Sequence, residues 1–191
     1  MLTFPRLISG SLILPNENFM PMNCKKILFL FLWMATTASA QQKDYSDDVK
    51  SIDGITTALY EVISGEAGAA RDWDRFRNLF KPEARLIPTR KDEAGKLITK
   101  AMSPEEYIQL FQSRIPTGFF ERELHRTTEQ YGTVAHLFST YETRDKKDGP
   151  ITNRGINSIQ LFYDGTRYYI VTIFWCAESM GFSLPEKYLK Q

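Results

Sequence analysis

The sequence predicts an α+β fold, with helices first and an antiparallel sheet afterwards. Apolar residues recur at helical spacing in three early segments, which end near Val62, Pro82 and Pro116. Four long runs rich in β-branched and aromatic residues follow, separated by turn residues: 119–130, 134–144, 153–163 and 167–175. This order is typical of α+β domains, in which one face of the sheet is buried against the helices. Because the strands are long and the helices few, we expect the sheet to curl around them.

Local signals set the boundaries of the second and third helices. Asp72 is placed to cap the second helix, and Pro82 is expected to end it. Ser103, Pro104 and Glu106 form a strong start for the third helix. A serine N-cap followed three residues later by a glutamate makes a capping box, and proline is favoured in the first turn.

Two hairpins are expected outside the helices. The first joins short strands at 84–88 and 97–101 through a charged loop. The second has a two-residue turn at 131–132, so that Gln130 faces Thr133. The turn sets the register of the two strands, and with it the side chains that share each face.

The second hairpin carries both histidines that follow residue 40, and they are candidates for acid–base chemistry. In the expected register His125 faces Phe138 and His136 faces Thr127, which makes the histidines diagonal neighbours roughly 7–8 Å apart. Four glutamates would share their face: Glu121, Glu123, Glu129 and Glu142. Imidazole titrates near neutral pH, so His125 with Glu123 is the predicted catalytic pair. The alternatives are an ordinary polar sheet face or a metal site, although no compact ligand motif such as HExxH is present.

Residues 22–40 have the three parts of a cleavable signal peptide. Lys25 and Lys26 provide the basic region, an apolar run covers 27–35, and a small-residue cleavage site ends at Ala40. The apolar run is shorter than the ~20 residues that a membrane-spanning helix needs, so no stable membrane anchor is expected. Cleavage would leave the rest of the chain exported, in the periplasm or secreted.

The chain therefore divides into three expected parts. Residues 1–21 would be an over-extended start, because a signal peptide normally begins close to its basic residues. The true start would then be Met22, with Met20 as the alternative. Residues 22–40 are the signal, and 41–191 form one domain of ordinary size.

The composition excludes several partners. The chain has 24 Lys and Arg against 23 Asp and Glu, and the part after residue 40 is close to neutral. This charge balance gives no reason to expect binding to nucleic acid or to an anionic membrane surface. Cys176 is the only cysteine after residue 40, so an intramolecular disulfide is impossible there. We expect Cys176 to be a buried small apolar residue rather than a nucleophile.

Several stretches resemble the nuclear transport factor 2-like superfamily, which includes ketosteroid isomerase, scytalone dehydratase and the SnoaL-like proteins. Residues 71–87, RDWDRFRNLFKPEARLI, look like its second helix and first strand, and 164–171, DGTRYYIV, resemble its late hairpin. The ending, with 174–175 and 184–189, is similar to that of exported, functionally uncharacterised bacterial members. The resemblance implies a cone-shaped, cystatin-like roll, with N-terminal helices packed on a curved antiparallel sheet and a pocket between them. It also implies frequent dimerisation.

The catalytic residues of scytalone dehydratase are largely missing from this sequence. The stretch 72–75, DWDR, is closest to scytalone dehydratase, but 68–70, GAA, stands where that enzyme has acidic and tyrosine residues. Pro88 stands where a further catalytic tyrosine would follow the first strand, and only His125 falls near a catalytic histidine. The dehydratase reaction is therefore not expected.

A pocket in this fold would be lined from both the helices and the sheet. The predicted ligand-binding residues are Trp73, Phe76, Tyr107, Phe111, His136, Tyr141, Arg154 and Trp175. The simpler alternative is that the aromatic residues fill the core, and that Arg154 is solvated or lies in a dimer contact. Neither a metal nor another cofactor is expected, because no metal-cysteine cluster or phosphate-cradling glycine loop is present.

Three functions remain open from the sequence. The first is an exported domain whose pocket holds a small hydrophobic or aromatic molecule. The second is a small-molecule lyase or isomerase that uses His125 with a nearby carboxylate. The third is a structural dimerisation domain. Apolar residues on both faces of one strand, Ile156 and Phe162 against Ile159 and Leu161, favour a homodimer.

Overall fold

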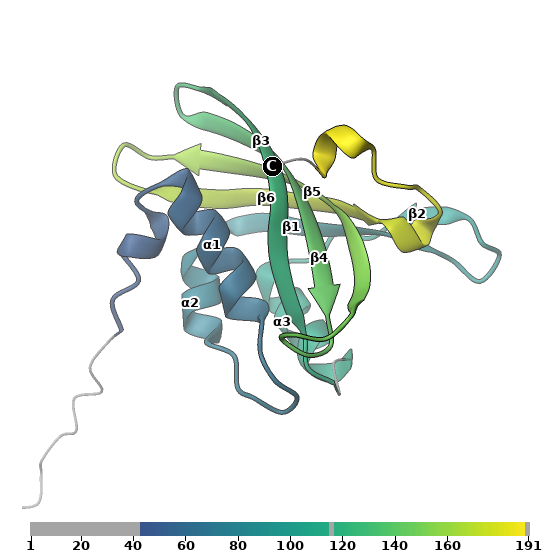
Figure 1. Ribbon diagram of the computed structural model, residues 1–191. Coiled ribbons are helices and arrows are strands. Elements are labelled where there is room, and N and C mark those ends of the chain that lie inside the picture. Colours follow the sequence, from purple (N-terminus) through teal and green to yellow (C-terminus); the bar gives the residue numbers. More distant parts are fainter. Residues whose placement is uncertain (1–42, 115–116, 190–191) are drawn as a thin grey trace, which may run out of the picture. The chain divides into compact units, whose positions relative to one another are not determined.

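The structure is a computed structural model that describes residues 43–114 and 117–189 (Figure 1). The expected signal peptide and the expected over-extended start lie outside the described residues. Within the described ranges, no helix has both the length and the apolar character that crossing a membrane would require. The fold below is therefore that of the chain from Lys43 onward.

A curved sheet carries the fold, and in the described residues it has six strands. They are β1 (Phe80–Lys91), β2 (Leu97–Thr99), β3 (Phe120–Tyr131), β4 (Val134–Arg144), β5 (Ile151–Tyr163) and β6 (Tyr168–Ala177). Their order across the sheet is β2-β1-β6-β5-β4-β3, and β1 with β6 is the parallel pair among antiparallel ones. Strands β3 to β6 form the antiparallel meander that the sequence predicts.

The helices cover one face of this sheet, which we call the inner face. In chain order the helical elements are η1 (Asp47–Val49), α1 (Ile52–Ile63), α2 (Trp73–Asn78), α3 (Pro104–Arg114), η2 (Glu178–Met180) and η3 (Glu186–Tyr188). Figure 1 shows α1, α2 and α3 on one side of the sheet and the C-terminal segment on the other. Ile55 and Phe76 from the helices join Leu137 and Ile159 from the strands in one buried core. The predicted α+β architecture is confirmed.

The predicted capping box at the start of α3 is confirmed. The backbone N–H of Ser103 donates to Glu106 Oε2 at 2.7 Å, and the backbone N–H of Glu106 donates to Ser103 Oγ at 3.2 Å. Each side chain thus satisfies a backbone donor that the first helical turn leaves unpaired.

Strand β1 begins earlier than the sequence predicts. Helix α2 ends at Asn78, and β1 starts at Phe80 rather than after Pro82. The pairing of β1 with β6 shifts register between Phe80 and Arg85. Pro82 lies in this irregular stretch, where a residue without a backbone N–H costs no ladder hydrogen bond.

The turn between β3 and β4 lies one residue later than expected. Tyr131 pairs with Val134, so the two-residue turn is Gly132-Thr133, and Gly132 has φ 56° in the left-handed region. Because of this shift, each predicted pair between the turn and His125 moves by two positions, whereas pairs from Glu123 onward, away from the turn, move by one. The expected facing of Gln130 with Thr133 is wrong.

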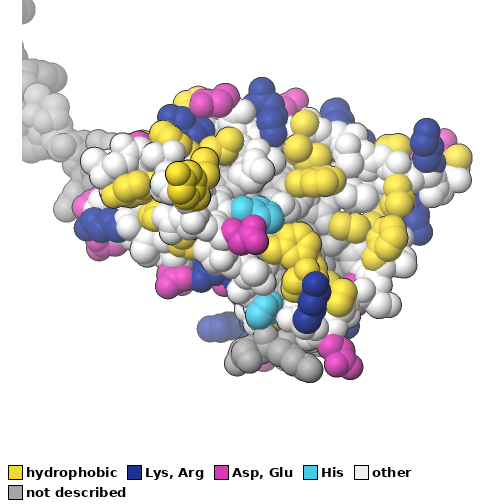
Figure 2. Space-filling model, turned by 90° about the horizontal axis from the view of Figure 1, so that it is seen from above, with side chains coloured by type: hydrophobic (Ala, Val, Ile, Leu, Met, Phe, Trp, Pro, Cys, Tyr) yellow, Lys and Arg dark blue, Asp and Glu magenta, His cyan; other side chains and the backbone are white. Residues whose placement is uncertain are grey.

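The shift separates the two histidines along the hairpin. His125 faces Thr140, and His136 faces Glu129, which is four residues further along β3. Four residues of strand span about 13 Å, so the histidines are not diagonal neighbours. They do lie on one face of the molecule, as Figure 2 shows.

A β-bulge in β3 changes which side chains face the helices. Glu123 pairs with Tyr141, whereas His125 pairs with Thr140, so Leu124 is the extra residue on β3. An extra residue interrupts the alternation of side chains between the two faces of a strand. Side chains before Leu124 therefore point to the opposite face from the one that simple alternation predicts.

The contacts of β3 agree with this reversal. Arg126, next to His125, donates to Thr56 on α1 at 2.8 Å, so His125 points away from the helices. Glu121 and Glu123 point toward them. The expectation that these two glutamates share a face with His125 is wrong, because strict alternation does not hold across the bulge.

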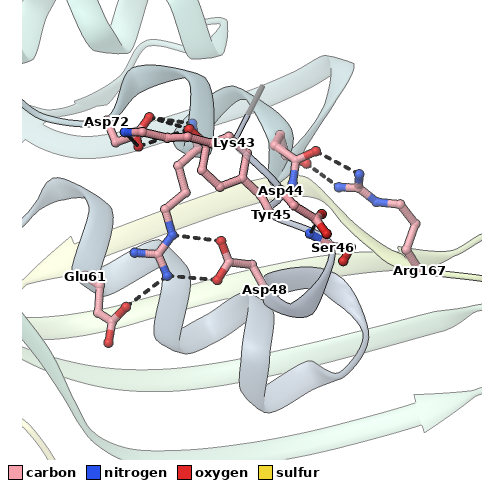
Figure 3. Close-up of polar contacts among 10 residues, drawn as sticks. Lys43, Asp44, Tyr45, Ser46, Asp48, Glu61, Asp72 and Arg167 are labelled. Carbon is pink, nitrogen blue, oxygen red and sulfur yellow. Dashed lines mark hydrogen bonds and ion pairs between the residues drawn. The ribbon is translucent and has the colours of Figure 1, made fainter. Parts of the chain in front are cut away.

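A polar network fastens the N-terminal residues to the helices (Figure 3). Asp72 accepts hydrogen bonds from Lys43 Nζ at 2.8 Å, from the Tyr45 hydroxyl at 2.9 Å and from the backbone N–H of Arg75 at 3.1 Å. The hydrogen bond from Lys43 is the main cause that lowers the pKa of Asp72 to about 2. Arg75 also binds Asp48 through two hydrogen bonds, at 2.7 and 2.8 Å.

Replacing Asp72 with alanine is expected to lower the free energy of unfolding by about 1 kcal/mol at pH 7, because the helix cap and its ion pair are lost. The pKa of Asp72 is lower in the folded state than its usual 3.8. Its contribution is therefore present above that value and disappears as the pH falls through about 2. Urea unfolding at pH 7 and at pH 2 measures the difference.

Asp74→Ala is the matched control for Asp72→Ala. Asp74 lies on the same helix with its side chain 83% exposed, and it pairs with Arg77 at the surface. Its removal is expected to change stability by less than about 0.5 kcal/mol. Equal losses in the two variants would contradict the assigned cap.

Candidate functional site

A cavity of about 270 Å³ lies between the helices and the inner face of the sheet. Most of its wall is apolar, and its aromatic members are Phe76, Tyr107, Phe111, Phe119, Tyr141 and Trp175. Its polar members are Glu121, Thr143, Asn153 and Asn157. A mostly apolar cavity with a few converging polar groups is the usual form of a small-molecule site.

Aromatic packing holds the walls of this cavity in place. Tyr107 stacks on Phe76 with ring centroids 5.5 Å apart, and the Trp175 ring meets Tyr107 edge-on at 6.4 Å. Phe111 meets Phe119 edge-on at 5.4 Å. Such pairs stabilise beyond their buried area, so the cavity is bounded by rings that hold one another in position.

Five of the eight predicted ligand-binding residues line the cavity: Phe76, Tyr107, Phe111, Tyr141 and Trp175. Trp73 lies behind this wall, with its ring 5.7 Å from Phe76 and 5.5 Å from Phe111. The rings on helices α2 and α3 could be predicted from the sequence, because they are aromatic residues at helical spacing: Trp73, Phe76, Tyr107 and Phe111.

The other two predicted ligand-binding residues lie outside the cavity. His136 Nε2 is 2.9 Å from Ser158 Oγ, on the outer face of the sheet. Arg154 donates to Glu178 Oε2 at 2.8 Å, which ties β5 to the C-terminal segment. Cys176, expected to be buried, is partly exposed.

The structure does not bring the predicted catalytic pair together. His125 faces outward, whereas Glu123 faces the helices and accepts a hydrogen bond from Ser139 Oγ at 2.5 Å. Elsewhere in 43–114 and 117–189, no group of three or more His, Cys, Asp and Glu side chains is arranged to hold a metal ion. The polar chemistry of the cavity must come from other residues.

Glu121 is the acidic residue of the cavity wall, although the sequence predicts it on the same face as the histidines. It lies on β3 before the bulge, opposite Thr143 on β4, and its side chain forms part of the cavity wall. Burial raises the pKa of its carboxyl group to about 8, and a hydrogen bond with Asn157 acts in the opposite direction. Glu121 keeps some accessible surface, because it borders both this cavity and a second pocket that Arg122, Arg144 and Lys147 also line.

Two tyrosine hydroxyls share the cavity with Glu121. Burial raises the pKa of Tyr107 and of Tyr141 above their usual range, and the charge that Glu121 can carry raises them further. Among the described residues, neither hydroxyl has a hydrogen-bond partner. Buried polar groups normally have hydrogen-bond partners, so these two hydroxyls are available to bind a molecule in the cavity.

No protein-family model matches the chain, and no curated protein matches it either. Solved structures do share its fold. One is a protein of unknown function with a cystatin-like fold from Nostoc punctiforme PCC 73102, with 13% identity and a TM-score of 0.52 over 71% of this chain and 92% of that one. The domain therefore has a cystatin-like α+β fold, as the resemblance implies.

Two further structures have similar scores. The β subunit of a putative aromatic-ring-hydroxylating dioxygenase from Novosphingobium aromaticivorans has 12% identity and a TM-score of 0.50, over 66% of this chain and 86% of that one. A Mycobacterium tuberculosis protein of unknown function has 12% identity and a TM-score of 0.50, over 73% of this chain and 75% of that one. At such identities the similarity shows the fold alone.

Replacing Glu121 with glutamine is expected to stabilise the domain at alkaline pH. The pKa of Glu121 is raised from its usual 4.5 to about 8 in the folded state. The folded state therefore retains a proton that the unfolded chain releases, and stability falls as the pH rises between these values. The variant lacks this loss of stability, which amounts to at most ~5 kcal/mol at about 1.4 kcal/mol for each pH unit. Denaturant titrations from pH 4 to pH 9 measure the difference.

Glu129→Gln serves as the control for Glu121→Gln. Glu129 lies on the same strand, with a side chain that is 81% exposed. Its replacement should leave the slope of stability against pH nearly unchanged. A wild-type slope that Glu121→Gln does not reduce would refute the enclosed position of this carboxyl group.

Proposed function

We propose that the domain binds a small, uncharged, mainly apolar or aromatic molecule that carries a hydrogen-bond acceptor, such as a carbonyl oxygen. The observation that carries this proposal is the placement of Glu121 with Tyr107 and Tyr141 in one apolar cavity. The fold alone supports no such conclusion, because one fold hosts many functions.

The preference for an acceptor follows from the protonation of the cavity groups. A carboxyl group whose pKa is about 8 is mostly protonated at neutral pH, and in that form it donates a hydrogen bond. The hydroxyls of Tyr107 and Tyr141 are donors as well. A neutral carbonyl oxygen can accept from one or more of these three groups.

The preference for a neutral ligand follows from the charges around the cavity. Among the described residues that line it, there is no Lys or Arg. An anionic ligand would lose its hydration without gaining a counter-charge, which is costly in an apolar site. The cavity volume of about 270 Å³ suits a molecule of one or two small rings.

A second candidate function is proton transfer, as in a lyase or isomerase. A group with a pKa near 8 is well matched to accept a proton from a carbon next to a bound carbonyl group at neutral pH. Glu121 supports this role better than His125, because His125 faces away from the cavity. The tyrosine hydroxyls would then stabilise the negative charge that develops on the carbonyl oxygen.

We also propose that the protein is exported, that it belongs to the nuclear transport factor 2-like superfamily, and that it forms a homodimer. The signal-like sequence of residues 22–40 supports export, and the resemblance of 71–87 together with the cystatin-like fold supports membership of the nuclear transport factor 2-like superfamily. Homodimerisation is supported by large apolar side chains left exposed on the sheet, with Val134 57% and Phe174 44% exposed. A purely structural dimer is the remaining alternative.

Small aromatic ketones and aldehydes are expected to bind at pH 6.5 and to bind at least about tenfold more weakly at pH 9.5, where Glu121 has lost its proton. Thermal-shift screening followed by calorimetry measures both affinities. In Glu121→Gln, whose amide still donates, binding should persist and lose its pH dependence. In Glu121→Leu it should weaken at pH 6.5.

His125→Ala is the control for these binding experiments, and it should leave affinity unchanged. A ligand that binds wild type and Glu121→Leu equally well would contradict the assigned donor. Proton transfer has its own readout, since a bound ketone would exchange hydrogen for deuterium at its α-carbon in heavy water. That exchange should be lost in Glu121→Gln.

Export predicts a defined mature end. In a bacterial host that expresses the full chain, the exported protein is expected to start at Gln41, because cleavage follows Ala40. N-terminal sequencing of the periplasmic and secreted fractions checks this. Replacing Ala40 with a bulky residue such as tyrosine should block processing, whereas full-length protein that stays in the cytoplasm of the unmodified strain would contradict the proposal.

A further inference from the structure

A line of hydrogen bonds runs from the cavity to the surface of the domain. Asn157 Nδ2 donates to the Tyr60 hydroxyl at 3.1 Å, and the Tyr60 hydroxyl lies 2.7 Å from Ser139 Oγ. Ser139 Oγ in turn donates to Glu123 Oε1 at 2.5 Å. Three of the four residues are buried, whereas the Glu123 side chain is 26% exposed.

The chemistry of the groups gives this line one direction. A carboxylate only accepts hydrogen bonds, so Ser139 must use its single hydroxyl proton toward Glu123. Ser139 can then only accept from Tyr60, whose own proton is used in that bond. The Tyr60 oxygen is left as an acceptor, and the group that donates to it is the amide of Asn157.

This direction fixes the orientation of the Asn157 amide. Its NH2 group faces Tyr60, and a reversed amide would place a carbonyl oxygen against a hydroxyl oxygen that has no proton left to give. The NH2 group has a second hydrogen, and Asn157 lies in the cavity wall together with Glu121. Hydrogen bonding by Asn157 lowers the pKa of the Glu121 carboxyl group, which burial raises. One amide thus links the line of hydrogen bonds to the cavity acid.

We propose that Glu123 is a positioning residue for the cavity: through Ser139 and Tyr60 it holds the NH2 group of Asn157 toward Glu121. Without the acceptor at Glu123, Ser139 is free to donate to Tyr60, Tyr60 can donate to Asn157, and the amide can turn its oxygen toward the cavity. Glu123 therefore controls which hydrogen bonds Glu121 receives. Its effect on a ligand rests on the proposed function, but its effect on Asn157 does not.

Glu121 and Glu123 also border a second pocket, whose other charged residues are Glu61, Arg122, Glu142, Arg144, Lys147 and Asp148. Arg126 Nε lies 3.8 Å from Glu123, and Arg126 also pairs with Asp53 on α1. The tyrosines whose pKa the charge of Glu121 raises are Tyr60 from α1, Tyr107 from α3 and Tyr141 from β4. No cation takes part in the hydrogen bonds that lead from Glu123 to Asn157, so the orientation of these bonds is the route that the variants below test.

The test is the pH titration of the Glu121 carboxyl carbon, followed by NMR in the ligand-free full chain. Glu123→Leu removes the acceptor and is expected to raise the titration midpoint by about one pH unit, since Glu121 loses a hydrogen bond to its charged form. Glu123→Gln can still accept from Ser139 and should restore a midpoint near that of the wild type. The Asn157 side-chain amide resonances should move in Glu123→Leu and return in Glu123→Gln.

Ser139→Ala and Tyr60→Phe interrupt the same line at other points, and both should raise the midpoint as Glu123→Leu does. Glu129→Leu is the control at an exposed glutamate of the same strand. An unchanged midpoint in whichever of the three interrupting variants folds would overturn the proposal. Because no ligand is present, a failure here leaves the binding proposal intact, and a failure to find a ligand leaves this one intact.

Discussion

The β-bulge at Leu124 is the local feature on which the inner face of the domain depends. One extra residue in β3 points Glu121 and Glu123 toward the helices while Arg126, two residues beyond the bulge, still reaches α1. The same strand thus supplies the cavity acid, the outer end of the hydrogen-bond line and an anchor for a helix. Strict alternation would have placed both glutamates on the outer face of the sheet, away from the cavity.

Keeping Glu121 in an apolar wall is thermodynamically unfavourable at neutral pH, because the folded state holds a proton that the unfolded chain would release. Two tyrosine hydroxyls without partners among the described residues add to that cost. The interlocked rings around the cavity, with Tyr107 stacked on Phe76, offset it with favourable packing. Ionisable groups with strongly shifted pKa values inside a cavity are characteristic of functional sites. Residues that serve activity there often lower the stability of the fold.

Much of the fold could be predicted from the sequence, because its signals are local. The capping box at Ser103, the four long strands and the aromatic helical faces depend on residues close together in the chain. Five cavity residues followed from the same reasoning. The bulge at Leu124, the turn one residue later and the parallel pairing of β1 with β6 depend on contacts between distant segments. Glu121 was grouped with the histidines because no residue in 119–126 marks where alternation is interrupted.

The parallel pair of β1 and β6 joins strands from the two ends of the described chain. The middle of the sheet therefore closes only when the last strand arrives, and until then both β1 and β5 present unpaired edges. Such non-local closure gives a high contact order, which slows folding and prolongs exposure of aggregation-prone strands. Maturation of the domain is thus expected to be sensitive to the loss of β6, the strand that also supplies Ile173, Trp175 and Ala177 to the cavity wall.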